Sequence, residues 1–226
     1  MTSVGLVVQA RMGSTRLPGK VLRPVGHLTL LGHVIGRLSQ LPQRWPVVVA
    51  TSTDARDDAI VAWCRQADVA TFRGSEHDVL DRYLQCARTW DFEHVVRLTA
   101  DNPFTDVPEL ERLVQLHLDG GFDYTHSFGM MPLGVGTEVI SRSALERSHV
   151  EGLQPHHREH VNEYIQEQPE LFRIGVLDIP ANKRAPNLRL TVDTEEDWRR
   201  ADALARQARG RWLETQEAIA LCSSSA

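Results

Sequence analysis

The segment A-R-M-G-S-T-R-L-P-G-K, residues 10–20, combines three cations with glycines and hydroxyl groups directly after the apolar run Val4–Gln9. Glycines let a backbone approach an anion closely, and successive N–H groups can bind phosphate oxygens. Arg11, Arg16 and Lys20 could neutralise a triphosphate and the charge that develops on it. These residue types in this spacing favour a phosphate-binding loop over a basic solvated turn.

The loop follows neither of two common phosphate-loop patterns. Five residues separate Gly13 from Gly19, and Val21 stands where a Walker A loop has Ser or Thr. A Walker A loop has four residues between its glycines. The G-x-G-x-x-G pattern is also absent, so we expect a different kind of nucleotide-binding loop.

Two aspartates follow predicted strands further along the chain. Asp101 comes after the predicted strand 95–99, and Asp193 comes after the predicted strand 188–192. Two carboxylates at adjacent strand ends suffice for Mg²⁺, which keeps several waters and is shared with substrate phosphates. Asp193 alone is equally compatible with a helix N-cap, but the pair favours a metal site.

The segment H-H-R-E-H, residues 156–160, fits the inverted zincin pattern H-x-x-E-H. Zinc would take His156 and His160, which lie four apart on one helical face, together with a further ligand. Pro155 begins the segment and leaves His156 in the first helical turn, which disfavours this site. A zinc hydrolase therefore stays a minor alternative.

The elements that must position these residues alternate along the chain. Predicted strands are 4–9, 46–50, 69–72, 95–99, 122–127, 138–141, 172–177 and 188–192; predicted helices are 30–41, 57–66, 78–90, 108–118, 143–150, 157–168 and 195–209. The initial β-α-β-α order predicts an α/β fold with helices on both faces of a mainly parallel sheet. Such sheets bind ligands at the carboxyl ends of their strands. We expect a loop at 128–136, a polar linker at 180–187, one domain over 1–222 and a disordered tail at 223–226.

Composition narrows the function classes. The chain has 226 residues, and 42% of them are hydrophobic, which is enough for a core and excludes bulk disorder. No apolar run approaches the ~18 residues that span a bilayer. Three cysteines without a C-x-x-C pair, and no signal-peptide pattern, lead us to expect a cytoplasmic protein.

The charge is unevenly distributed. Residues 1–53 contain six Lys and Arg side chains and no Asp or Glu, although the whole chain carries −5. A basic segment opposite an acidic one suits an anionic ligand bridged by a metal. It does not suit a broad nucleic-acid surface.

The string V-V-Q-A-R-M-G-S-T-R-L-P-G-K-V-L resembles the opening of the cytidylyltransferase family that makes CMP-activated acidic sugars. This family includes the CMP-3-deoxy-manno-octulosonate and CMP-acylneuraminate synthetases, and the SpsF-type branch is the most similar. The resemblance continues, in the family's order, through V-V-V-A-T-S-T-D (47–54), F-R-G-S-E-H-D-V-L-D-R-Y (72–83), V-R-L-T-A-D-N-P-F-T-D (96–106), R-E-H-V-N-E-Y-I (158–165) and L-R-L-T-V-D-T-E-E-D (188–197). It therefore spans nearly the whole chain.

The resemblance implies a three-layer α/β/α nucleotidyltransferase fold, Rossmann-like and GT-A-like, that binds CTP and Mg²⁺. It implies metal ligands at Asp101 and Asp193, and catalytic cations at Lys20, Arg11 and Arg16. The implied nucleotide-binding residues are Ala10, Arg11, Met12, Gly13, Ser14, Lys20, Arg73, Ser75 and Asp101, with Arg73 and Ser75 against the cytosine. The implied acceptor-binding residues are Glu138, Glu159 and His160. Lys20 is one of only two lysines, so Lys20→Ala is a clean test, and we expect a large loss of turnover with little loss of fold.

The acceptor stays open at this point. SpsF-type proteins often carry an arginine in a P-R-G-L-D-like stretch, whereas this chain has P-L-G-V-G-T-E at 132–138. We expect the acceptor to be a small anion, either a sugar acid or a phosphonate. We expect the protein to bind neither nucleic acid nor a membrane. Resembling enzymes are commonly dimers. A non-catalytic nucleotide-binding protein of a polysaccharide pathway is the alternative from another class.

Overall fold

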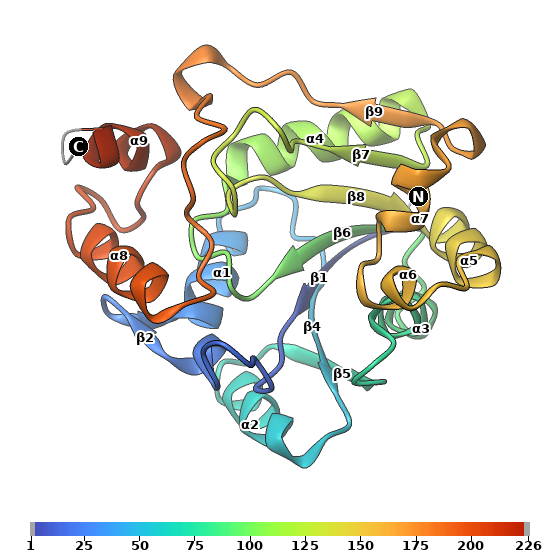
Figure 1. Ribbon diagram of the computed structural model, residues 1–226, viewed down its shortest axis with the longest axis horizontal. Helices are drawn as coiled ribbons and strands as arrows, with labels where there is room; N and C mark the ends of the chain where they lie inside the picture. Colours follow the sequence, from blue (N-terminus) through green and yellow to red (C-terminus); the bar gives the residue numbers. More distant parts are fainter. Residues whose placement is uncertain (1–2, 224–226) are drawn as a thin grey trace.

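A computed structural model describes residues 3–223 and shows one large mixed sheet with helices on both faces (Figure 1). The strand order is β5-β4-β1-β6-β8-β7-β9. The strands are β1 (Val4–Gln9), β4 (Val47–Ser52), β5 (Ala70–Gly74), β6 (His94–Thr99), β7 (Tyr124–His126), β8 (Glu138–Ser141) and β9 (Ile174–Val176). β8 runs antiparallel to both of its neighbours, and the other pairings are parallel. The predicted mainly parallel mixed sheet is confirmed.

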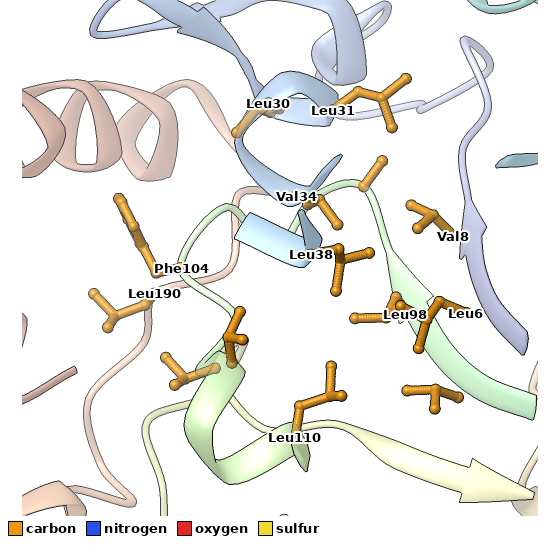
Figure 2. Packing of buried hydrophobic residues seen from close by; sticks show 14 of the residues in the cluster. Leu6, Val8, Leu30, Leu31, Val34, Leu38, Leu98, Phe104, Leu110 and Leu190 are labelled. Atoms are coloured by element: carbon orange, nitrogen blue, oxygen red, sulfur yellow. The ribbon is translucent and has the colours of Figure 1, made fainter. Parts of the chain in front are cut away.

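Helices cover the sheet because its central strands are apolar on both faces. The helices are α1 (Leu30–Leu38), α2 (Asp58–Gln66), α3 (Val79–Thr89), α4 (Val107–Gly120), α5 (Arg142–Glu151), α6 (Pro155–Glu159), α7 (Glu163–Glu167), α8 (Glu195–Arg206) and α9 (Thr215–Ser223). Leu6 and Val8 of β1 pack in a cluster with α1 and α4, as Figure 2 shows. Val7, between them, faces the opposite cluster with α3 and α5. None of the described helices has the length and apolar composition needed to cross a membrane.

Two predicted elements take another form. The predicted helix 157–168 is wrong as one helix: it breaks at His160, whose backbone is extended, into α6 and α7. The break places Val161 in the core and lets the Asn162 amide reach the buried Glu138 carboxylate. The predicted strand 188–192 forms no strand of the sheet, because its backbone bonds instead to Leu133 and Asp101 in neighbouring loops.

The sequence interpretation missed a hairpin and the last helix. A short antiparallel hairpin, β2 (Pro24–Val25) with β3 (Leu28–Thr29), connects the loop after β1 to α1. The missed helix is α9. The stretch before it is held to α1 by Arg37, whose guanidinium donates a hydrogen bond to the Leu213 carbonyl. The predicted tail falls partly in α9, which ends at Ser223, and residues 224–226 lie outside the described residues. The predicted linker 180–187 contains a 3-10 turn, Ala181–Lys183.

The loop 128–136 has no helix or strand of its own, as predicted, and it packs tightly against the segment 188–192. The Leu133 carbonyl accepts hydrogen bonds from the backbone N–H groups of Leu190 and Thr191. Gly134 has φ +92°, and a Cβ there would lie 2.5 Å from the Thr191 nitrogen. Glycine is therefore required at this crossing for both its conformation and its size.

Gly134→Ala should lower the free energy of unfolding by about 3 kcal/mol, because strain at positive φ adds to a backbone clash. Gly129→Ala is the matched control, since Gly129 has φ +88° but open space around its Cβ position. That variant should lose only the conformational part, about 1 kcal/mol. Urea unfolding of both variants measures the difference, and equal losses would show that the contact with Thr191 is unimportant.

Candidate active site

A cleft of about 920 Å³ lies at the carboxyl ends of β1 and β6. These strands are parallel neighbours, and Gln9 pairs with Thr99 at their ends. The two loops that follow therefore leave the sheet side by side. The rest of the cleft is formed by the loop 127–136, the end of α6 and the segment 186–193. In Figure 1 the dark-blue loop after β1 lies beside the start of α8.

The loop 10–20 is held in shape by a buried carboxylate. Asp57, only 2% exposed, accepts hydrogen bonds from the Met12 N–H at 2.7 Å and from the backbone and hydroxyl of Ser52. The Gly19 N–H then closes the loop on the Met12 carbonyl at 3.0 Å. Gly19 has φ +70° and starts the 3-10 turn Lys20–Leu22. The loop is thus curved back, and Lys20 points across the strand ends.

The Lys20 ammonium lies between the two predicted metal ligands. Its nitrogen is 2.8 Å from Asp101 Oδ2, 2.8 Å from Asp193 Oδ1 and 2.8 Å from the Val192 carbonyl. Arg16 adds a longer contact to Asp193, at 3.4 Å. Burial alone would raise the pKa of Asp193, but the Lys20 hydrogen bond and the nearby positive charges outweigh it, so that pKa lies below its ordinary value.

This arrangement fits a divalent cation. Carboxylate oxygens from two remote segments already converge on one positive charge, which is the donor chemistry that hard cations prefer. The two side chains are 26% and 21% exposed, which leaves room for the waters that Mg²⁺ retains. Asp101 and Asp193 are thus brought together as expected, although Asp193 does not follow a strand.

The position of Lys20 revises one expectation. Lys20 is 7% exposed, and it joins the segments before β2, after β6 and before α8. Removing it leaves a carbonyl and two carboxylates without their shared donor. Lys20→Ala is therefore a test of stability as well as of turnover, and a loss of fold would not exclude a catalytic role.

The predicted acceptor residues separate into two groups. Glu159 and His160 line the cleft, and Glu159 lies 3.9 Å from Arg11. Glu138 does not line it. Its carboxylate is fully buried, pairs with Arg97 and accepts hydrogen bonds from the Tyr124 hydroxyl at 2.6 Å and the Asn162 amide at 2.9 Å.

Arg97 is the member of this buried network that reaches the cleft. Burial would lower the pKa of its guanidinium, but the opposing effect of the Glu138 charge is larger. The pKa therefore lies above its ordinary value, and Arg97 stays charged. Glu138 is thus a positioning residue for Arg97, rather than a residue that contacts an acceptor.

Four predicted nucleotide-binding residues lie outside the cleft lining: Ala10, Met12, Arg73 and Ser75. Ala10 and Met12 shape the loop through their backbone. The Arg73 guanidinium instead binds the Ser52 and Asp54 carbonyls at 2.9 Å and pairs with Asp58. The Ser75 hydroxyl accepts a hydrogen bond from the Asp78 N–H just before α3. In this structure Arg73 fastens a turn and Ser75 supports the start of a helix.

The sequence interpretation missed several residues of the lining: Gln9, Arg97, Thr99, Asn102, Arg189 and Thr191. Within residues 3–223, Gln9 Oε1, Arg97 Nε and Asn102 Oδ1 are buried without a hydrogen-bond partner. Buried polar atoms are nearly always paired. These atoms therefore mark places where a ligand or water completes the site. A polar residue at the end of an apolar strand, as at Gln9, is the signal that could have found them.

The cleft brings together a cationic loop and a carboxylate pair, which can hold a polyphosphate and a divalent cation at once. A family model described as cytidylyltransferase matches residues 6–219. The chain belongs to the cytidylyltransferase family. This cytidylyltransferase is a nucleotidyltransferase enzyme, as the sequence predicted.

Curated relatives agree with the family. The cytidylyltransferase is 41% identical over 213 residues to the spore coat polysaccharide biosynthesis protein SpsF of Bacillus subtilis, covering 92% of this chain and 88% of that protein. It is 29% identical over 146 residues to an 8-amino-3,8-dideoxy-manno-octulosonate cytidylyltransferase of Shewanella sediminis, covering 64% of this chain and 57% of that one.

Solved structures agree as well. A cytidylyltransferase from Leptospira borgpetersenii superposes with a TM-score of 0.93 at 31% identity, covering 100% of this chain and 95% of that one. A CMP:2-keto-3-deoxy-manno-octonic acid synthetase complexed with CTP has a TM-score of 0.70 at 18% identity, with 91% and 99% coverage. The predicted nucleotidyltransferase fold is confirmed.

The carboxylate pair can be tested without turnover. Lys20→Met should lower the free energy of unfolding by about 3 kcal/mol, since Asp101 loses its ion-pair partner and Asp193 keeps only Arg16 and Arg189. Mg²⁺ should then raise the melting temperature of this variant more than that of the wild type, because the cation replaces the missing charge. Thermal unfolding with and without MgCl₂ measures this.

Lys183→Met is the matched control. Lys183 also lies between two carboxylates, Asp106 at 2.9 Å and Glu109 at 3.0 Å, outside the cleft. Those carboxylates are only 1% and 5% exposed, against 26% and 21% for Asp101 and Asp193, which leaves no room for the waters that Mg²⁺ retains. Mg²⁺ should therefore not restore this variant. Equal responses of the two variants to Mg²⁺ would refute a specific cation site at Asp101 and Asp193.

Proposed function

We propose that this cytidylyltransferase transfers CMP from CTP to a small anionic acceptor, with Mg²⁺ and release of pyrophosphate. The observation that carries the proposal is the meeting of Lys20 with Asp101 and Asp193 beside the loop 10–20. One cleft therefore contains both cations that could bind phosphates and carboxylates that could bind a metal ion. The family and the named sugar-acid relatives support the same reaction.

In this proposal the protein contributes positioning and charge. The Gly13 N–H and the Ser14 hydroxyl would contact phosphate oxygens, while Arg11 and Arg16 would stabilise the leaving pyrophosphate. Mg²⁺ held by Asp101 and Asp193 would neutralise phosphate oxygens when bound. Phosphoryl-type transfers depend mainly on such positioning and neutralisation.

The acceptor proposed is a sugar acid, with a phosphonate as the alternative. The loop 132–138 carries no arginine, but two arginines from elsewhere line the cleft: Arg97 of β6, paired with Glu138, and Arg189 before α8, paired with Asp193 and Asp197. The Arg97 Nε–H, which is buried without a hydrogen-bond partner, could donate to an acceptor anion. A phosphonate oxygen is already ionised, and a sugar hydroxyl could lose its proton when the metal activates it, so the proposal requires no protein general base.

Pyrophosphate release tests the reaction directly. The full chain is incubated with CTP and Mg²⁺ against a panel of sugar acids and phosphonates, with UTP, ATP and GTP as nucleotide controls. Release that needs CTP and one acceptor supports the proposal and identifies the acceptor. Equal release from all four nucleotides, or CTP binding without release on every acceptor, would contradict it.

Arg16→Ala should lower the turnover of the identified reaction by at least ~100-fold, the effect of removing one charge-stabilising group. Its side chain is 64% exposed, so stability should stay within about 0.5 kcal/mol of wild type. Arg44→Ala removes an exposed arginine of the same basic segment outside the cleft and should leave turnover unchanged. Equal losses in both variants would mean that overall charge matters rather than Arg16.

A further inference from the structure

Two histidines and a glutamate meet where α6 and α7 pack together, outside the cleft lining. His156 Nε2 lies 2.9 Å from Glu167 Oε1, and His157 Nε2 lies 2.8 Å from Glu167 Oε2. The three ligand atoms lie within 4.8 Å of one another. Among the described residues this is the one group of at least three His, Cys, Asp or Glu side chains with such spacing.

The break between the two helices creates this cluster. The chain turns at His160 and brings the last residue of α7, Glu167, back to the first turn of α6. The His157 ring is buried and packs edge-on against Tyr164, with 5.4 Å between the ring centroids, so its orientation is fixed. The Glu163 carboxylate lies 4.0 Å from His156 Nε2 and can approach as a fourth ligand.

We propose that this cluster is a zinc site that clamps α6 to α7. Two neutral imidazoles and a carboxylate are ligands that Zn²⁺ takes in tetrahedral sites, whereas Mg²⁺ prefers oxygen ligands alone. The fourth position is open to Glu163 or to water.

Binding requires the ring proton to move from Nε2 to Nδ1 on both histidines, because each Nε2 now donates to Glu167. The His157 Nδ1 atom accepts a hydrogen bond from the Gln154 N–H at 3.3 Å, which places the ring proton on Nε2. A metal at Nε2 requires the proton on Nδ1 instead. The hydrogen bond from the Gln154 N–H to His157 Nδ1 is then lost. Because Gln154 is exposed, its N–H can donate to water instead.

The proposed site is structural rather than hydrolytic. The H-x-x-E-H hypothesis used His156 with His160, but His160 is not part of the cluster and lines the cleft instead. The clamped segment carries Glu159 and His160 to the cleft and Asn162 to the buried Glu138. A zinc ion here would hold this wall of the cleft in place without contacting substrate.

Zinc titration of the full chain, free of any affinity tag and in excess Mg²⁺, tests the proposal. The wild type should bind one equivalent of Zn²⁺ and gain thermal stability from it. Cobalt at the site should show the intense visible absorption of a four-coordinate ion. His156→Gln and Glu167→Gln should each weaken zinc binding by at least ~100-fold.

The controls are His77→Gln and Glu170→Gln, which remove an exposed histidine and an exposed glutamate outside the cluster and should bind zinc like the wild type. His156 and Glu167 are exposed, so their variants should fold even if a change at the buried His157 does not. Equal zinc binding by wild type and the His156 and Glu167 variants, or no binding by wild type, overturns the proposal. Either result leaves the transferase function untouched.

Discussion

The contact of the Lys20 ammonium with Asp101 and Asp193 organises this enzyme. It joins the loop after β1, the end of β6 and the chain that leads into α8, which are remote in sequence. Without a positive charge between them the two carboxylates would repel each other in a partly buried place. The same contact therefore serves the fold and holds together the two carboxylates of the proposed cation site, so a change at Lys20 affects both stability and the proposed chemistry.

The sheet determines where that contact forms. β1 and β6 are parallel and in register, so both following loops begin at the same level. Asp57 then curves the first loop by binding its Met12 N–H, and a glycine at positive φ turns Lys20 toward the second. The phosphate-binding character of the segment is readable from its composition, but its curvature depends on a carboxylate 45 residues away.

The sequence predicted most of the fold and part of the site. The spacing of apolar residues predicted the bounds of β1, α3 and α4 to within a few residues, because the local sequence pattern and burial in the fold agree there. The prediction was wrong at 157–168, where the contact of the Asn162 amide with Glu138 favours a break over one continuous helix. It was also wrong at 188–192, a segment with a strand-like sequence whose backbone bonds to a loop instead of the sheet. Arg73 was expected to face the nucleotide but pairs with Asp58 outside the cleft lining, because the sequence pattern of a cation after a strand is the same in both cases.

The Arg97–Glu138 pair shows what such patterns leave out. A buried ion pair contributes little net stability compared with apolar side chains of equal size. Here Glu138 takes donors from β6, β7 and the turn between α6 and α7, namely Arg97, Tyr124 and Asn162. The pair therefore serves to position Arg97. It holds the charged guanidinium at the cleft and connects it to the segment that carries Glu159 and His160. An acceptor bound between these groups would meet a wall whose charges are already oriented.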